Sequence, residues 1–168
     1  LCLLSMGRYS AHAASSPISP GTSLSQLELS TPDSPEKRNY LCIQDAEVFT
    51  LSDIPAKLLI VEFFSTFCKV CQAQTPLDNN LYNLILGDPE LKKDIKMIGI
   101  GVGNKPKTIA AYSKARKVTF PLIADPGGKI MKEHEVYLLP QTLLLNKEGK
   151  VLTNHQGVIT DLDNYLQE

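Results

Sequence analysis

Hydrophobic residues gather in two long runs, and each has the length and composition of a buried β-strand. The first run is Leu58–Phe64 and the second is Ile95–Val102. Near-continuous apolar runs of this length are typical of strands that are covered on both faces of a parallel sheet. Between them, Leu77, Leu81, Leu84 and Ile85 recur at helical spacing, so the pattern predicts a strand, a helix that begins at Cys68, and a second strand.

The rest of the pattern predicts shorter elements around this unit. In chain order they are extended pieces at 40–43 and 48–50, helices over 106–117 and 127–135, a hairpin with strands over 142–146 and 150–154, and a last helix that Thr160 caps, with Ile159, Leu162 and Leu166 on one side. No internal repeat is present, and alternation of strands and helices indicates an α/β fold.

The composition fits one ordinary globular domain. The chain has 168 residues, of which 43% are hydrophobic, and a formal net charge of −1. Basic residues are scattered among acidic ones, which argues against binding to nucleic acid. Residues 14–38 are rich in Ser, Pro and Thr, and are predicted to form a disordered linker before a domain at 39–168.

Residues 1–13 resemble the remnant of an export signal or membrane anchor, because an apolar start at Leu1–Leu4 is followed by the A-x-A pattern Ala11-His12-Ala13. Either origin predicts an extracytoplasmic, periplasmic domain that is soluble or tethered to the membrane through its N-terminus. The alternative is a disordered chain terminus.

The candidate chemistry lies where the first strand meets its helix, in the motif Cys68-Lys69-Val70-Cys71. Residues three apart share a helix face, which brings two thiols within disulfide range. A cysteine that begins a helix also lies beside unpaired backbone N–H groups and the positive end of the helix dipole, which stabilise negative charge. The pair is therefore suited to thiol–disulfide exchange.

A structural disulfide or half of a zinc site is the alternative. Structural zinc needs four ligands, commonly from a second C-x-x-C or a pair of histidines at close spacing. The chain contains neither, since its other cysteines are Cys2 and Cys42 and its histidines, His12, His134 and His155, are scattered. A strand that leads directly into C-x-x-C favours the redox interpretation.

Two segments in the right order give a family resemblance over about residues 40–168. The segment 60–71, followed by Pro76, resembles the active-site stretch of thioredoxin-fold proteins, and 136–151 resembles their cis-proline strand and hairpin. With 101–104 and 120–125, the chain is most similar to bacterial TlpA/ResA-like thiol-disulfide oxidoreductases. The resemblance implies a thioredoxin-like fold: a central mixed sheet with a parallel βαβ unit and a C-terminal antiparallel hairpin, flanked by helices. Phe67 replaces the usual Trp and Val70 a common Pro, which affects redox poise rather than reaction type.

Glu62 is the second candidate catalytic residue, because an acid inside an apolar strand is costly unless it has a use. Burial raises the pKa of such a carboxyl, which suits proton exchange near neutral pH. The resemblance implies that Glu62 exchanges a proton with Cys71. The alternative is a strand residue that points at solvent or pairs with Lys57.

The resemblance also implies a substrate-binding surface formed by Phe67, Leu139 and Pro140. Pro140 is expected to follow a cis peptide bond, with Leu139 backbone groups available to an extended substrate chain. Glycines at 99, 101 and 103 are expected to allow close packing beside the active-site loop rather than to bind a nucleotide. Cys42 is predicted to be an inert buried thiol, and His134 and His155 are predicted to be surface residues.

The sequence therefore predicts a thiol-disulfide oxidoreductase in which Cys68 attacks and Cys71 resolves. The resemblance implies net reduction of client proteins, such as apocytochrome or copper-centre precursors, with a membrane thiol-electron transporter as the electron source. No small cofactor or metal is expected beyond the Cys68–Cys71 disulfide itself. The alternative is a thioredoxin-fold copper metallochaperone that uses the cysteine pair and a distal histidine, His155 or His134.

Overall fold

The computed structural model describes residues 18–43 and 47–160. The elements follow in the order β1 (Glu28–Ser30), α1 (Pro35–Leu41), β2 (Val48–Thr50), a 3-10 turn (Leu51–Asp53), β3 (Leu58–Phe64), α2 (Lys69–Gly87), α3 (Pro89–Asp94), β4 (Ile95–Val102), α4 (Pro106–Arg116), β5 (Leu122–Asp125), α5 (Lys129–His134), β6 (Gln141–Asn146) and β7 (Val151–Gln156). The predicted C-terminal helix lies outside the described residues.

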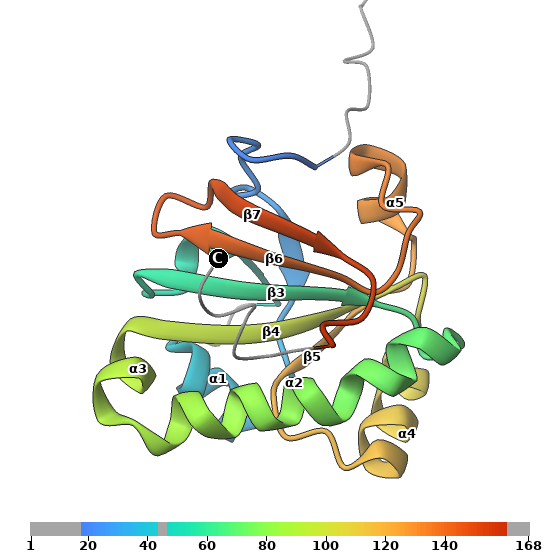
Figure 1. Ribbon diagram of the computed structural model, residues 1–168, viewed down its shortest axis with the longest axis horizontal. Helices are drawn as coiled ribbons and strands as arrows, with labels where there is room; N and C mark the ends of the chain where they lie inside the picture. Colours follow the sequence, from blue (N-terminus) through green and yellow to red (C-terminus); the bar gives the residue numbers. More distant parts are fainter. Residues whose placement is uncertain (1–17, 44–46, 161–168) are drawn as a thin grey trace, which may run out of the picture.

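The central sheet is mixed, with its strands in the order β5-β4-β3-β6-β7. Strands β3, β4 and β5 are parallel, whereas β6 is antiparallel to both β3 and β7. Helix α2 connects β3 to α3 and β4 and lies along one side of the sheet with α4 (Figure 1). The structure thus has the predicted parallel βαβ unit and C-terminal antiparallel hairpin.

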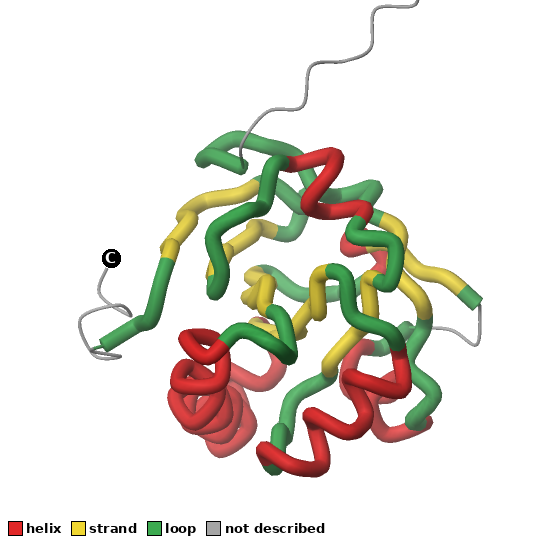
Figure 2. Tube along the Cα trace, turned by 90° about the vertical axis from the view of Figure 1, so that its right-hand side faces the viewer, coloured by secondary structure: helices red, strands yellow, loops and turns green. Residues whose placement is uncertain are grey.

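The two faces of the sheet bury separate apolar cores, because neighbouring residues of a strand point to opposite faces. On β3, Leu59, Val61 and Phe63 belong to the core that the N-terminal segment covers. Ile60 and Phe64 belong to the core beneath α2 and α4. In Figure 2, most of the helical tube lies below the strands and the N-terminal loops lie above them.

The N-terminal segment folds where a linker is predicted. Leu24, Leu27 and Leu29 are buried in the core, and β1 pairs with β2. The backbone of this segment also bonds to the β6–β7 hairpin, since the Leu24 N–H donates to the Gly149 carbonyl. The predicted linker at 14–38 is therefore wrong for residues 18–38. The segment is rich in Ser and Pro on average, but its isolated apolar residues are buried in the core.

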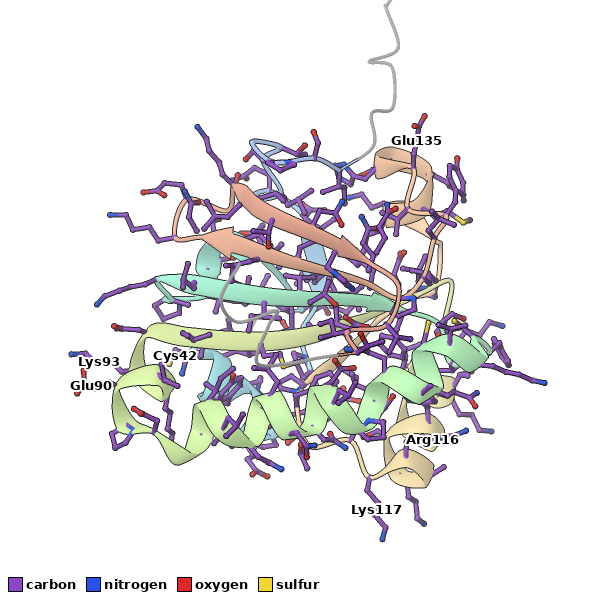
Figure 3. All side chains as sticks on the ribbon, viewed as in Figure 1. Cys42, Glu90, Lys93, Arg116, Lys117 and Glu135 are labelled. Atoms are coloured by element: carbon purple, nitrogen blue, oxygen red, sulfur yellow. The ribbon has the colours of Figure 1, made fainter. Side chains whose placement is uncertain are left out.

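Residues 40–43 end a helix and do not form the predicted extended piece. Ser34 caps α1, Pro35 occupies its first turn, and Cys42 ends it in the left-handed conformation with φ 54°. This turn buries Leu41 and Ile43 but exposes Cys42, so the prediction of a buried thiol is wrong. Cys42 lies at the opposite end of the molecule from the start of α2 (Figure 3).

Gly99 and Gly101 of β4 allow close packing, as predicted, whereas a Cβ atom at Gly103 would meet nothing within 4 Å. A Cβ atom at Gly99 would lie 2.6 Å from Leu122 Cδ2, and one at Gly101 would collide with Ile109. The next turn holds the active-site loop, because the buried Asn104 side chain accepts a hydrogen bond from the Thr66 N–H at 2.8 Å. This segment therefore supports the loop that carries the cysteines.

Candidate active site

The cysteine motif lies at the carboxyl end of β3, where Cys68 caps the N-terminus of α2. The Cys68 Sγ accepts a hydrogen bond from the Cys71 N–H at 3.1 Å. Both cysteines are free thiols; Cys68 is half-buried, whereas Cys71 is 2% exposed. A partly exposed sulfur at the start of a helix is accessible to an incoming disulfide. The geometry thus gives one accessible cysteine and one buried cysteine a single turn apart.

The loop before β6 reaches the same point from the other end of the sequence. The Leu139–Pro140 peptide bond is cis, and the Cys68 Sγ lies 3.7 Å from the Leu139 carbonyl oxygen. Apolar side chains around this point face solvent: Phe67 is 79% exposed, Tyr137 68% and Leu138 63%. The structure therefore brings together Phe67, Leu139 and Pro140 beside Cys68, and sequence analysis missed Tyr137 and Leu138.

Glu62 is buried on the face of β3 that packs against α2. Its side chain is 2% exposed, and its Oε2 accepts a hydrogen bond from the Thr142 hydroxyl at 2.6 Å. Lys57 pairs instead with Asp94 at 2.6 Å, so the alternative of a Glu62–Lys57 pair is wrong. Burial, followed by the nearby Asp78 carboxyl, raises the pKa of Glu62 well above its usual range, and the Thr142 hydrogen bond opposes this shift.

Asp78 is a second buried carboxyl that sequence analysis missed. It lies on the sheet-facing side of α2, 3% exposed, and its Oδ1 accepts a hydrogen bond from the Gln74 side-chain amide at 2.9 Å. Burial raises the pKa of Asp78 to about 7, and the Gln74 hydrogen bond opposes the shift. Helical spacing was the available signal. Cys71, Gln74, Asp78 and Leu81 are successively three or four residues apart, so they lie on one face of α2.

A small cavity joins these groups. Its volume is about 10 Å³, and Glu62, Cys71, Thr75 and Asp78 are among its lining residues, with Tyr112 of α4. Such a volume is about that of one water molecule. The Thr75 hydroxyl donates to the Cys71 carbonyl at 3.1 Å and pairs with the Tyr112 hydroxyl at 2.6 Å. The buried cysteine therefore faces a small cavity that is lined in part by two carboxyl groups.

The buried cysteine is the harder of the two thiols to ionise. Burial raises the pKa of Cys71 far above its ordinary value, and the hydrogen bond with Cys68 raises it further. Cys71 cannot act as a nucleophile while it retains its proton. The site therefore needs a base near Cys71 at the moment it reacts.

His134 and His155 do not complete a metal site with Cys68 and Cys71. Across residues 18–43 and 47–160, no three His, Cys, Asp or Glu side chains are grouped so as to hold a metal ion. Both His134 and His155 are half-buried rather than fully at the surface as predicted. His155 lies on β7 opposite Thr142, and burial lowers the pKa of His134.

Solved structures show that the chain has a thioredoxin-like fold. A putative thiol:disulfide interchange protein DsbE from Chlorobium tepidum matches with a TM-score of 0.67 at 18% identity, over 89% of this chain and 94% of that structure. StoA from Bacillus subtilis matches with a TM-score of 0.56 at 24% identity, over 69% of this chain and 84% of that structure.

The chain belongs to the redoxin family, which it matches over residues 26–167. It is 31% identical over 121 residues to the thiol-disulfide oxidoreductase ResA of Bacillus thuringiensis subsp. konkukian (strain 97-27), covering 70% of this chain and 66% of that protein. It is 26% identical over 104 residues to the sporulation thiol-disulfide oxidoreductase A of Bacillus subtilis (strain 168), covering 60% of each. The chain thus spans at most 66% of the length of these two relatives.

In the part of the chain that the structure describes, no helix has the length and hydrophobicity of a membrane span.

Proposed function

We propose that this protein is a thiol-disulfide oxidoreductase that reduces disulfides in client proteins through Cys68 and Cys71. The observation that carries the proposal is the arrangement of the two thiols, with Cys68 half-exposed at the α2 N-terminus and Cys71 buried one turn later. An accessible sulfur that accepts a backbone N–H suits attack, and a buried partner suits resolution. The names of the two sequence relatives describe the same chemistry.

The reaction transfers two electrons from the dithiol to a client disulfide. The Cys68 thiolate attacks one client sulfur, forms a mixed disulfide and releases the other sulfur as a thiolate. Cys71 then loses its proton and attacks Cys68, which forms the Cys68–Cys71 disulfide and releases the second client sulfur as a thiolate. Glu62 belongs to the buried acidic group that manages the Cys71 proton.

The client binds across an apolar surface beside Cys68, where Phe67, Tyr137 and Leu138 are exposed. Leu139 is half-buried and Pro140 is buried at the base of this surface. An extended client segment beside Leu139 would place its disulfide near Cys68, because the Leu139 carbonyl already lies 3.7 Å from that sulfur. Apocytochrome or copper-centre precursors are the proposed clients, and a membrane thiol-electron transporter would restore the dithiol. The reaction requires no small cofactor, since the cysteines themselves carry the electrons.

The proposed location is extracytoplasmic. The A-x-A pattern Ala11-His12-Ala13, which lies outside the described residues, supports export. A fractionation experiment on the native producer with an antibody against the folded domain tests this part separately. Recovery of the protein only with cytoplasmic markers would refute the location and leave the exchange chemistry unaffected.

Trapping of mixed disulfides tests the function. Because Cys42 is exposed, the experiment starts from a background in which Cys2 and Cys42 are both replaced by Ser. In that background, Cys71→Ser should accumulate mixed disulfides with an added disulfide-containing peptide, since Cys68 attacks but nothing resolves the product. Cys68→Ser should accumulate none, because Cys71 is buried. Equal trapping by both variants, or trapping by neither, would refute the proposal.

A further inference from the structure

Two carboxyl groups face one cavity without a cation between them. Glu62 of β3 and Asp78 of α2 are 2% and 3% exposed and line the same small space with Cys71. In the described part of the chain, the ion pairs formed by basic side chains involve neither of them. Two like charges cannot both be stable in such surroundings, so the pair holds at least one proton near neutral pH.

Hydrogen bonding distinguishes the two carboxyls. The Gln74 Oε1 accepts a hydrogen bond from the backbone N–H of Ile159 at 2.8 Å, so the amide nitrogen of Gln74 must face Asp78. That nitrogen can only donate, and a donor stabilises the carboxylate form of Asp78.

Glu62 has a partner that suits either protonation state. The Thr142 hydroxyl can donate to a carboxylate or accept from a protonated acid. The second oxygen of Glu62, Oε1, is buried and has no hydrogen-bond partner in the described part of the chain. An oxygen without a donor makes a negative charge on Glu62 costly, so Glu62 is better suited to keep its proton.

We propose that Asp78 is the group that receives the proton of Cys71 during resolution, while Glu62 stays protonated beside it. This role rests on the proposed function. The S–H bond of Cys71 breaks, and its proton passes to the Asp78 carboxylate directly or through one water molecule. The Cys71 sulfur bonds to the Cys68 sulfur, and the Cys68–client bond breaks with its electron pair on the client thiolate. That thiolate then takes up the proton from Asp78.

The surroundings of Asp78 supply few other titratable groups. Cys71 precedes it on α2, Glu62 faces it from β3, and Tyr112 lines the cavity from α4. His155 of β7 lies on the same face of the sheet, in register with Thr142 and two strands from Glu62. His155 is not among the residues that line the cavity. Asp78 is therefore the ionised group best placed to act on Cys71.

Reaction of the reduced protein with dithiobis(nitrobenzoate) separates the two steps. Attack by Cys68 releases the first coloured thiolate, and resolution by Cys71 releases the second, so stopped-flow absorbance should show two phases. The Cys2/Cys42 double-Ser background removes the other thiols. Asp78→Asn should slow the second phase by roughly 10- to 100-fold above neutral pH and abolish its rise with pH across neutrality. Glu62→Gln should keep that rise. Asp94→Asn removes a half-buried aspartate that pairs with Lys57 and does not line the cavity, so it should leave both phases unchanged.

The outcomes separate this role from the function itself. A wild-type protein without a second phase would refute the proposed function and this role together. A normal wild-type second phase that Asp78→Asn leaves unchanged would refute the role of Asp78 alone. Loss of the pH dependence in Glu62→Gln but not in Asp78→Asn would make Glu62 the acceptor and overturn the assignment.

A measurement on the wild-type chain covers the case in which Asp78→Asn does not fold. Carbon NMR of the reduced protein, with labelled carboxyl carbons, follows each group through a pH titration. The Asp78 carbon should report ionisation near neutral pH, while the Glu62 carbon should still report a protonated acid there. The reverse order of titration would overturn the proposal.

Discussion

Glu62 and Phe63 are neighbours on β3, and both are buried, but they face opposite sides of the sheet. The Phe63 side contains apolar residues from the N-terminal segment and the strands. The Glu62 side contains apolar residues together with Cys71 and the buried polar groups of α2. Successive side chains of a strand point to opposite faces of the sheet. One strand can therefore place apolar residues that stabilise the fold on one face and residues that react on the other.

The two faces also differ in what burial does to the free energy of unfolding. A fully buried Phe side chain stabilises the fold by roughly 1.5–3 kcal/mol through the removal of apolar surface from water. A buried carboxyl without a cation lowers stability once the pH favours its ionised form, because the fold must keep it protonated or desolvate its charge. Truncation of Phe63 and neutralisation of Glu62 should therefore change the free energy of unfolding in opposite directions.

The largest effect is expected on the apolar face. Phe63→Ala should lower the free energy of unfolding by about 3–5 kcal/mol, since it removes a completely buried ring and leaves a cavity. Urea unfolding measures this. The matched control is Phe67→Ala, the same substitution at a side chain that is 79% exposed, which should change stability by less than about 0.5 kcal/mol. It should instead weaken client binding. Equal losses of stability for the two variants would contradict the division of tasks.

How much of this could be predicted from the sequence also differs between the faces. The apolar runs of β3 and β4 and the cysteine motif predicted the centre of the sheet and the two thiols, because continuous hydrophobicity and C-x-x-C are local signals. β5 and α3 were not predicted, since each is short. The N-terminal segment was assigned to a linker because its burial depends on single leucines that meet a distant hairpin.

The two buried carboxyls, Glu62 and Asp78, also differ in how far the sequence predicts them. Glu62 could be singled out as a charge inside an apolar strand. Asp78 and Gln74 are polar residues on a helix, where solvent exposure is the ordinary expectation. Only the packing of α2 on the sheet buries them. The hydrogen bond between Gln74 and Ile159 joins residues 85 apart in the sequence, so no local pattern could predict it.

The contribution of the buried carboxyls to the free energy of unfolding should depend on pH. The pKa values of Glu62 and Asp78 are raised in the fold, so the unfolded chain releases these protons at a lower pH than the folded protein. The penalty is absent below the unfolded-state values of about 4 and grows as pH rises toward the folded values, by about 1.4 kcal/mol per pH unit for each group. Glu62→Gln should therefore gain stability relative to wild type as pH rises from about 5 to 7.

Urea unfolding of the reduced protein at several pH values checks this difference. Asp78→Asn should behave similarly to Glu62→Gln, with its gain levelling off near pH 7, where folded Asp78 begins to ionise. Glu90→Gln is the control, because it makes the same substitution at an exposed side chain. A pH-independent difference for Glu62→Gln would show that Glu62 is ionised in the fold.

The smallest effect is expected at the cavity wall on the acidic face. The Thr75 hydroxyl donates to the Cys71 carbonyl, so the Tyr112 hydroxyl must donate to Thr75. Tyr112→Phe removes that donor and keeps the ring that packs on Phe64. Loss of one buried hydrogen bond should lower the free energy of unfolding by roughly 1 kcal/mol. Because Thr75 still bonds to Cys71, the resolution step should keep its rise with pH while its rate changes little. If Tyr112→Phe loses the rise of the resolution rate with pH, Tyr112 rather than Asp78 lies on the route of the Cys71 proton. The same stopped-flow measurement therefore tests whether the two carboxyls alone handle that proton.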